Sequence, residues 1–301
     1  MKKKLLAVLL AMTVLFIAAC GGDESADGGE VFEFGAQSYT DPKIAAQMVK
    51  ILVEENTDHE VNITEDIQAS PQILASIERE EFDFAMLYSG EVYNNHFDDV
   101  DYSTNSEQTI QNAQDLFGPE YDMTWFDTIG FKNEYAIAIR GDFAEENDIT
   151  TISDLEAHAD DLTLGTDTTW VERDNDGYRG FQERYGFEFG DVRGMEVSLM
   201  YTGIANSELD VVTAYTVDPQ IAEYDLRILE DDQEFFPPYD ASLVARNEVL
   251  ENYPEVEEIF LELVGTVSTE EMSELIRQVD LEERSTEEVA REFLETEGLL
   301  N

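Results

Sequence analysis

The segment Asp83-Phe84-Ala85-Met86-Leu87-Tyr88-Ser89-Gly90-Glu91 is an apolar run of strand length that ends in a tyrosine and then carries an acid on a short Ser-Gly link. In an open α/β sheet, ligands bind just outside the carboxyl ends of the strands. Tyr88 and Glu91 therefore form a candidate half-site for a small cation. Taken alone, the segment favours a simpler interpretation, in which Tyr88 is a rim aromatic and Glu91 one more solvated acid.

The residues before this strand indicate the fold class. Apolar spacing predicts strands over 31–37, 60–64 and 82–88, and helices that begin near residues 41 and 70. Thr40 or Asp41 is expected to cap the first helix, ahead of Pro42. This β-α-β-α-β order implies parallel strands with right-handed crossovers, and therefore a doubly wound α/β sheet. Gln37 and Tyr88 then end on the same edge.

A second α/β series follows this first one. The pattern predicts strands over 134–140, 162–165, 195–199, 211–215 and 226–229, and helices over 177–185 and 204–209. Phe235–Asp240 contains two prolines, so it is expected to be an extended crossing between lobes. Helices are predicted over 255–264, 269–279 and 286–295. Ser268 and Ser285 each open a Ser-Thr-Glu-Glu run that is typical of a helix start.

The N-terminal residues are expected to lie outside the fold. Lys2–Lys4 precede a short apolar run that ends in Ile17-Ala18-Ala19-Cys20. This pattern resembles a bacterial lipoprotein signal. It implies that residues 1–19 are cleaved and that Cys20 carries a lipid anchoring the protein to the outer face of the cell membrane. Residues 20–30 read as a flexible tether. The apolar run is shorter than the roughly 20 residues that span a bilayer.

Acidic residues dominate the composition. The chain has 17 Lys and Arg against 69 Asp and Glu, a formal net charge of −52, while 43% of its residues are hydrophobic and supply a globular core. Nucleic acid is excluded as a partner, because phosphates require neutralisation by Lys and Arg. Repulsion among the acids is screened at about 1 M salt, where the Debye length is about 3 Å. We therefore expect a secreted protein of a salt-loving organism.

Motifs for catalysis are missing from the sequence. Cys20 is the single cysteine, so the folded part has neither a disulfide framework nor a catalytic thiolate. His59, His96 and His158 belong to no HExxH pattern, and the chain has no P-loop, GxSxG or GxGxxG motif. We expect no enzyme activity and no cofactor.

One acidic segment matches the spacing of a calcium-binding loop. The matching positions 1, 3, 5, 6 and 12 are Glu172, Asp174, Asp176, Gly177 and Glu183. Position 1 is Glu rather than Asp, and Arg179 stands where such loops carry an apolar residue. A solvated turn before a helix is therefore favoured, and a calcium-dependent surface protein stays an alternative.

Four tyrosines fall at predicted strand ends or in the proline segment: Tyr88, Tyr135, Tyr215 and Tyr239. Aromatic rings around a quaternary ammonium ion contribute about 2 kcal/mol or more each when desolvated. Each tyrosine separately is equally explained as a half-buried rim residue. Spacing alone does not show whether they converge.

Several segments, in order and in both halves of the chain, carry a family resemblance. They are Gly35-Ala36-Gln37-Ser38, Thr124-Trp125-Phe126-Asp127, Gly177-Tyr178-Arg179-Gly180-Phe181, Tyr185-Gly186-Phe187, Ala214-Tyr215-Thr216-Val217-Asp218 and Phe235-Phe236-Pro237-Pro238-Tyr239-Asp240. Together they resemble the substrate-binding lipoproteins of osmoprotectant ABC importers, which bind glycine betaine, choline, carnitine and related compounds.

The resemblance implies a two-lobed, type II periplasmic-binding-protein-like fold, with a doubly wound sheet in each lobe and two crossings. Lobe I is expected to comprise residues 31–137 and 236–301, and lobe II residues 138–235. The implied cation cage consists of Tyr88, Tyr135, Tyr215 and Tyr239. Gln37 matches a residue at the polar end of the ligand. The implied partners are a small quaternary ammonium ligand and the permease and ATPase subunits, and the protein is expected to be a monomer.

The sequence departs from the family at Tyr88-Ser89-Gly90-Glu91, where many relatives have Tyr-Thr-Gly-Thr. The second threonine of relatives donates to the carboxylate of glycine betaine, whereas ionised Glu91 only accepts hydrogen bonds. Glu91 therefore favours choline modestly, if it faces the ligand. Another solute, such as an amino acid or ergothioneine, remains an alternative. Trp170 and Arg173 lie in a shared motif, and we assign them no direct contact.

Overall fold

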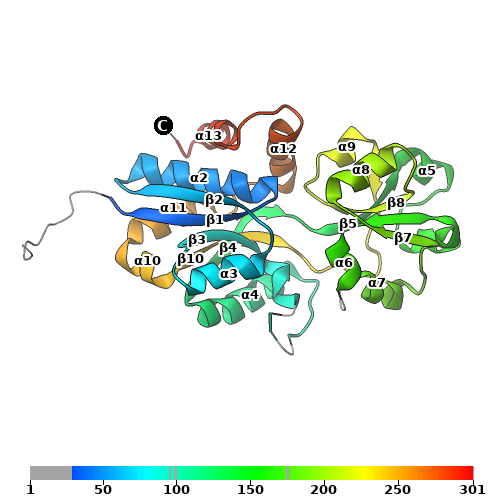
Figure 1. Ribbon diagram of the computed structural model, residues 1–301, viewed down its shortest axis with the longest axis horizontal. Coiled ribbons are helices and arrows are strands. Elements are labelled where there is room, and N and C mark those ends of the chain that lie inside the picture. Colours follow the sequence, from blue (N-terminus) through cyan, green and yellow to red (C-terminus); the bar gives the residue numbers. More distant parts are fainter. Residues whose placement is uncertain (1–28, 95, 98–99, 174–175, 301) are drawn as a thin grey trace, which may run out of the picture.

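The computed structural model describes residues 29–94, 96–97, 100–173 and 176–300, which form two lobes with a five-stranded sheet in each (Figure 1). The predicted signal peptide, Cys20 and most of the tether lie outside the described residues, as does Asp174 of the candidate calcium loop. Within the described ranges, none of the helices has the length and apolar character that crossing a membrane requires.

The sheet of the first lobe contains strands from both ends of the chain. Its order is β2-β1-β3-β10-β4. The strands are β1 (Val31–Gln37), β2 (Glu60–Ile67), β3 (Phe84–Tyr88), β4 (Met123–Lys132) and β10 (Asp240–Arg246). β1 pairs in parallel with β2 and β3, as the β-α-β-α-β pattern predicts, and β10 runs antiparallel to β3 and β4. The carboxyl ends of β1 and β3 therefore share one edge.

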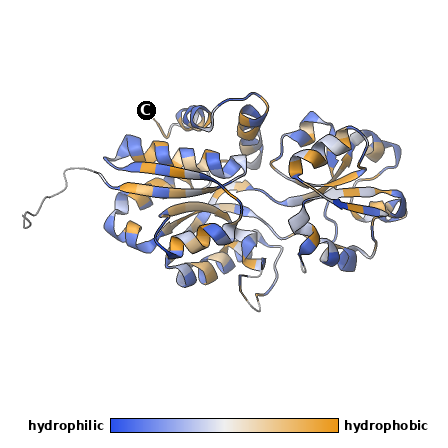
Figure 2. Cartoon of the chain, viewed as in Figure 1, coloured by the Kyte–Doolittle hydropathy of each residue, from blue (hydrophilic) through white to orange (hydrophobic). Residues whose placement is uncertain are grey.

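Helices cover both faces of this sheet. Successive residues of a strand point to opposite sides, so apolar strands present side chains that must be buried on both faces. They are α2 (Thr40–Asn56), α3 (Ser70–Glu78), α4 (Ser106–Tyr121), α10 (Asn247–Asn252), α11 (Pro254–Leu263), α12 (Thr269–Asp280) and α13 (Thr286–Thr296). Phe84 and Met86 of β3 enter the core under α2 and α11, whereas Ala85 and Leu87 enter the core under α3 and α4. Figure 2 shows hydrophobic residues on the strands and the inner helix faces.

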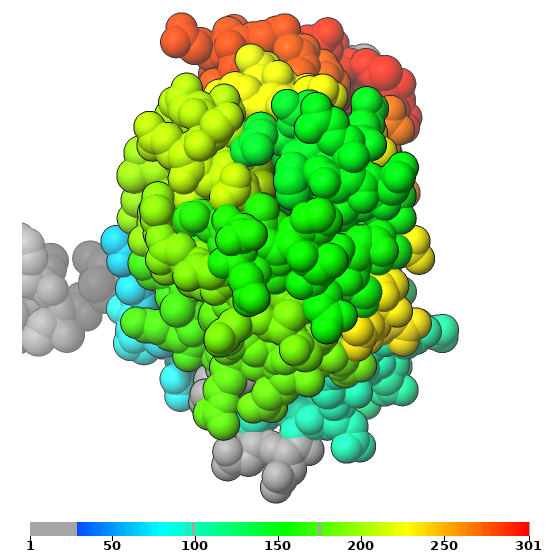
Figure 3. Space-filling view, turned by 90° about the vertical axis from the view of Figure 1, so that its right-hand side faces the viewer, coloured from blue at the N-terminus to red at the C-terminus, as the bar shows by residue number. Residues whose placement is uncertain are grey.

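The second lobe is built on the sheet β7-β6-β8-β5-β9 and forms the face seen in Figure 3, in green and yellow. Its strands are β5 (Tyr135–Arg140), β6 (Thr163–Thr166), β7 (Asp191–Gly194), β8 (Val211–Tyr215) and β9 (Leu226–Ile228). Its helices are α5 (Gly141–Glu146), α6 (Thr168–Glu172), α7 (Tyr178–Tyr185), α8 (Val197–Ala205) and α9 (Gln220–Glu223), with 3₁₀ turns at Ser153–Ala157 and Ala159–Asp161.

The chain passes between the sheets twice. It leaves the first sheet after β4 and enters the second at β5, and it returns between β9 and β10. The second passage contains the segment Phe235–Asp240, in agreement with the predicted extended crossing. The lobe boundaries at residues 137/138 and 235/236 stay a prediction, although the first of them falls inside β5, a strand of the second sheet.

One predicted strand is wrong. The segment 195–199 was expected to be extended and 204–209 helical, but β7 ends at Gly194 and a single helix, α8, begins at Val197 and ends at Ala205. A short apolar run cannot be assigned to strand or helix from periodicity alone. The helix starts at Ser268 and Ser285 are confirmed, because each serine side chain accepts a hydrogen bond from the backbone N–H three residues later.

Salt should stabilise this fold strongly. The chain has only 17 Lys and Arg against 69 Asp and Glu, and the three lysines of the described ranges, Lys43, Lys50 and Lys132, already lie in ion pairs. Most of the acids therefore have no cation to offset them. We expect the Tm to rise by about 5 °C or more between 0.1 and 2 M KCl, because screening relieves repulsion among the acids. Thermal unfolding followed by circular dichroism measures this rise. A Tm that does not respond to KCl would rule out adaptation to high salt.

Candidate functional site

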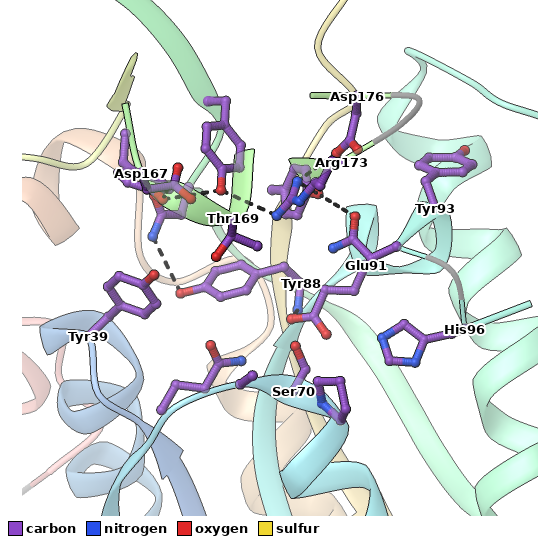
Figure 4. Close-up of a pocket in the computed structure, with 18 of the residues that line it drawn as sticks. Tyr39, Ser70, Tyr88, Glu91, Tyr93, His96, Asp167, Thr169, Arg173 and Asp176 are labelled. Carbon is purple, nitrogen blue, oxygen red and sulfur yellow. Dashed lines mark hydrogen bonds and ion pairs between the residues drawn. The ribbon is translucent and has the colours of Figure 1, made fainter. Parts of the chain in front are cut away.

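A cavity of about 340 Å³ lies between the two lobes and brings together all six residues predicted for the ligand site (Figure 4). The residues are Gln37, Tyr88, Glu91, Tyr135, Tyr215 and Tyr239. Each is at most 8% exposed. Figure 4 shows Tyr39, Ser70 and Glu91 on one side of the cavity, and Asp167, Arg173 and Asp176 on the other. The volume and the mixed lining suit a small, polar organic molecule.

Strand pairing brings two of the tyrosines together in the second lobe. Tyr135 is the first residue of β5 and Tyr215 the last of β8, and the two are direct partners in the antiparallel ladder. Facing residues in such a ladder hold their side chains close together. Their ring centroids lie 4.8 Å apart, and the Tyr215 hydroxyl donates to the Tyr135 hydroxyl at 3.2 Å.

The Ser-Gly link after β3 brings Tyr239 against Tyr88. A 3₁₀ turn, η1 (Ser89–Tyr93), follows the strand, and Ser89 Oγ accepts from the backbone N–H of Asp240 at 3.0 Å. A Cβ at Gly90 would lie 2.7 Å from the Tyr239 ring and from the carbonyl oxygen of Pro238. Only glycine therefore lets Tyr239 approach this closely, and its ring centroid lies 6.5 Å from that of Tyr88.

The four rings form a connected aromatic wall. Besides the two pairs above, the Tyr135 and Tyr239 centroids lie 6.0 Å apart with the rings nearly perpendicular. Burial raises the pKa of all four hydroxyls above the ordinary value, so the tyrosines are neutral. A neutral aromatic wall from both lobes can hold a cation through its ring faces.

Arg173 places a permanent cation within this wall. It follows α6, whose first turn is capped by Asp167, and its Cζ lies 5.0 Å from the Tyr135 ring centroid. Arg173 Nη1 donates to Asp176 Oδ2 at 2.7 Å and to the Tyr239 hydroxyl at 3.1 Å. Arg173 was assigned no contact from sequence, yet it lines the cavity, whereas Trp170 is fully buried behind it.

The polar end of the cavity is formed by Gln37 and Glu91. Glu91 Oε1 accepts from the backbone N–H of Tyr88 at 3.4 Å, while Glu91 Oε2 and Gln37 Nε2 are buried without a hydrogen-bond partner. Burial raises the pKa of Glu91 to about 7, against opposing contributions from Ser70 and other neighbours. Buried polar atoms without partners are rare and often mark a ligand position.

Asp41 supports the wall rather than capping a helix. The residue before α2 is Tyr39, and no side chain caps that helix. Asp41 is buried and accepts from the Tyr88 hydroxyl and, at 3.0 Å, from Asn133 Nδ2. The predicted cap at Thr40 or Asp41 is therefore wrong, and the carboxylate instead holds the Tyr88 ring in place.

Sequence reasoning missed several residues of the cavity. Tyr39, Asn133, Asp167 and Asp176 line it together with the predicted set. The Tyr39 ring, 42% exposed, lies 6.1 Å from the Tyr215 ring. Asp176 had been considered only as a calcium ligand, but it turns inward to Arg173. Within the part of the chain that the structure describes, no group of three or more His, Cys, Asp or Glu side chains is arranged to hold a metal.

Known transport proteins are similar to this chain in sequence. Residues 32–296 match the family described as the substrate binding domain of ABC-type glycine betaine transport system. The chain is 33% identical to the carnitine transport binding protein OpuCC of Listeria monocytogenes, over 98% of this chain and 97% of that protein. It is also 32% identical to an ergothioneine transport permease and binding protein of Helicobacter pylori, over 73% of this chain and 39% of that protein.

A solved structure is similar over nearly the whole fold. It is described as a glycine betaine/carnitine/choline ABC transporter and matches with a TM-score of 0.79 at 32% identity, covering 90% of this chain and 98% of that chain. The predicted two-lobed binding-protein fold is thereby confirmed.

Proposed function

The chain belongs to the family of substrate-binding domains of ABC-type glycine betaine transport systems, and from this premise we propose that it captures choline in the inter-lobe cavity for delivery to the permease and ATPase. Proteins of this family bind their substrates outside the cytoplasm. Attachment through a lipid on Cys20, a monomeric state and the absence of catalysis belong to the same proposal.

One observation carries the proposal: tyrosines from both lobes line a single cavity of about 340 Å³. A trimethylammonium group cannot donate hydrogen bonds, so its burial requires ring faces in place of water. Tyr88, Tyr135, Tyr215 and Tyr239 offer such faces on neighbouring sides. The ligand is therefore expected to bridge the lobes.

Glu91 supports choline over glycine betaine. Its side chain is 3% exposed, lines the cavity and has an oxygen without a partner. An ionised carboxylate accepts the hydroxyl proton of choline and adds attraction for the cation, but it repels a ligand carboxylate.

Arg173 favours carnitine as a second candidate. Carnitine carries a hydroxyl for Glu91 and a carboxylate for which a guanidinium is the preferred partner. Carnitine binding would require Arg173 to weaken its hydrogen bonds to Asp176 and Tyr239 in order to donate to the ligand carboxylate. Choline makes no such demand, so it stays the first choice.

A ligand panel with Glu91→Thr tests this selection. We expect the variant to bind glycine betaine about tenfold more tightly and choline about tenfold more weakly than the unaltered protein, since one charge-assisted hydrogen bond is worth about 1.5–3 kcal/mol. Isothermal titration with choline, carnitine, glycine betaine, ergothioneine and amino acids measures these changes.

The exposed Glu107→Thr provides the matched control and should leave all affinities unchanged. Unaltered affinities in Glu91→Thr would show that Glu91 does not select the ligand. Binding of ergothioneine or an amino acid, with no quaternary ammonium compound bound below millimolar concentration, would overturn the proposed function itself.

A further inference from the structure

The carboxyl group of Glu91 is buried at the polar end of the cavity with half of its hydrogen-bonding capacity unused. Oε1 accepts one long bond, of 3.4 Å, from the Tyr88 backbone N–H, and Oε2 has no partner. The nearby Gln37 Nε2 is also without a partner. An uncharged carboxyl can donate one hydrogen bond here, whereas an ionised carboxylate can only accept.

We propose that the proton on Glu91 decides which class of quaternary ammonium ligand the cavity accepts. With Glu91 ionised, the cavity binds a ligand that carries a hydroxyl at the end opposite its ammonium group, such as choline. With Glu91 protonated, the cavity binds a ligand that carries a carboxylate at that end, such as glycine betaine. This inference rests on the proposed function and adds a second ligand class to it, with the choice made by protonation.

The reason lies in the end of the ligand that reaches Glu91. A hydroxyl donates to an ionised carboxylate, while a carboxylate ligand meets a like charge there. Once Glu91 is protonated, its O–H donates to the ligand carboxylate. A buried carboxylic acid that stays neutral and acts as a hydrogen-bond donor is chemically well precedented.

Burial raises the pKa of Glu91 to about 7, so both forms are populated near neutral pH. Ser70, the Tyr88 backbone N–H and Gln37 are polar neighbours that oppose this rise. The Arg173 charge opposes it from the other lobe, although that charge is already paired with Asp176.

The other titratable groups that line or support the cavity do not replace Glu91. They are His96 after η1, Asp41 in α2, Asp167 before α6, Asp176 after α6, and the tyrosines Tyr39, Tyr88, Tyr93, Tyr135, Tyr215 and Tyr239. Burial lowers the pKa of His96, so the ring is mainly neutral above pH 7. Burial raises the pKa of Asp41 to about 6, but its carboxylate is covered by Tyr88 and Asn133.

Proton exchange on binding tests the inference directly. At pH 7 the protein should release about half a proton when choline binds and take up about half a proton when glycine betaine binds. The reason is that Glu91, with a pKa near 7, is half protonated there. Titration calorimetry in buffers of different ionisation enthalpy gives both numbers. Between pH 6 and 8 the ratio of the two Kd values should change about 100-fold, tenfold from each ligand.

Two variants test whether the exchanged proton belongs to Glu91. Glu91→Gln cannot ionise, so the opposite proton exchange should vanish for both ligands. Asp218 is the matched control: burial raises its pKa to about 7 as well, but its carboxylate does not line the cavity and accepts from the Tyr201 hydroxyl and from the Tyr215 backbone N–H. Asp218→Asn should therefore retain opposite proton exchange for the two ligands.

The outcomes separate the inference from the function it rests on. Proton exchange of the same sign for both ligands, or none for either, would overturn the role of the Glu91 proton while quaternary ammonium binding stands. This measurement uses the unaltered protein, so it does not depend on whether a variant folds. Failure of both ligands to bind at any pH would overturn the proposed function first.

Discussion

Replacing Tyr135 with leucine is expected to weaken choline binding by about 30-fold or more, the largest effect of any single cage substitution. One desolvated cation–π contact is worth about 2 kcal/mol or more, and leucine keeps apolar bulk while removing the ring. Tyr135 is the central ring of the cage, because its ring centroid lies within 6.0 Å of those of both Tyr215 and Tyr239. Titration calorimetry measures the loss.

Tyr135→Phe separates the ring from its hydroxyl. The hydroxyl accepts from Arg173 Nη2 at 3.3 Å and from Tyr215 at 3.2 Å, so its removal should cost about 1 kcal/mol of folding stability. The choline affinity should fall far less than in Tyr135→Leu, because the ring is kept. Tyr224→Leu, at an exposed tyrosine of the same lobe, should change nothing. Equal losses in Tyr135→Leu and Tyr135→Phe would contradict a cage that works through its ring faces.

Replacing Arg173 with methionine should destabilise the folded protein by about 3 kcal/mol. The substitution leaves Asp176, whose side chain is 3% exposed, as a buried charge without its cation, and an uncompensated buried charge is costly. The Tyr135 and Tyr239 hydroxyls lose a donor at the same time. Urea unfolding gives the change in the free energy of unfolding.

A double substitution and an exposed pair provide the controls. Arg173→Met combined with Asp176→Asn should recover most of the loss, because both charges are then gone. Arg179→Met breaks a pair with Glu183 whose side chains are about 70% exposed, and it should cost less than about 0.5 kcal/mol. A loss in the double variant as large as in Arg173→Met would show that packing, and not the buried charge, is responsible.

The fold was predictable where short-range pattern decides the structure. Alternation of apolar segments with helical ones gave β1 and β8 to the residue, the start of β2 and the end of β3. Strands β4 and β10 were not predicted, because they pair with each other and with β3 across long separations in sequence. The segment that became α8 was misassigned because an apolar run this short fits a strand and a helix equally well.

The residues of the cavity were predictable only where they lie at the ends of predicted strands or in the proline segment. Four tyrosines were singled out by their places at predicted strand ends or in the proline segment, the family resemblance implied the same four, and all four line the cavity. Arg173 and Asp176 lie outside regular strands, and their inward direction depends on how α6 ends against the second crossing. The partnerless oxygen of Glu91 likewise follows from burial between η1, β1 and α3, which spacing does not reveal.

If the ligand bridges the lobes as proposed, the two crossings between the sheets also bear on how long it stays. Tyr135 follows the first crossing directly, and Tyr239 precedes β10 at the end of the second. Tyr88 stays with one lobe and Tyr215 with the other, so separating the lobes splits the aromatic wall into two weak halves. On this proposal, we expect the residence time of the ligand to depend on the bending of two short stretches of backbone. A permease that separates the lobes would then release the ligand without a competing binding site.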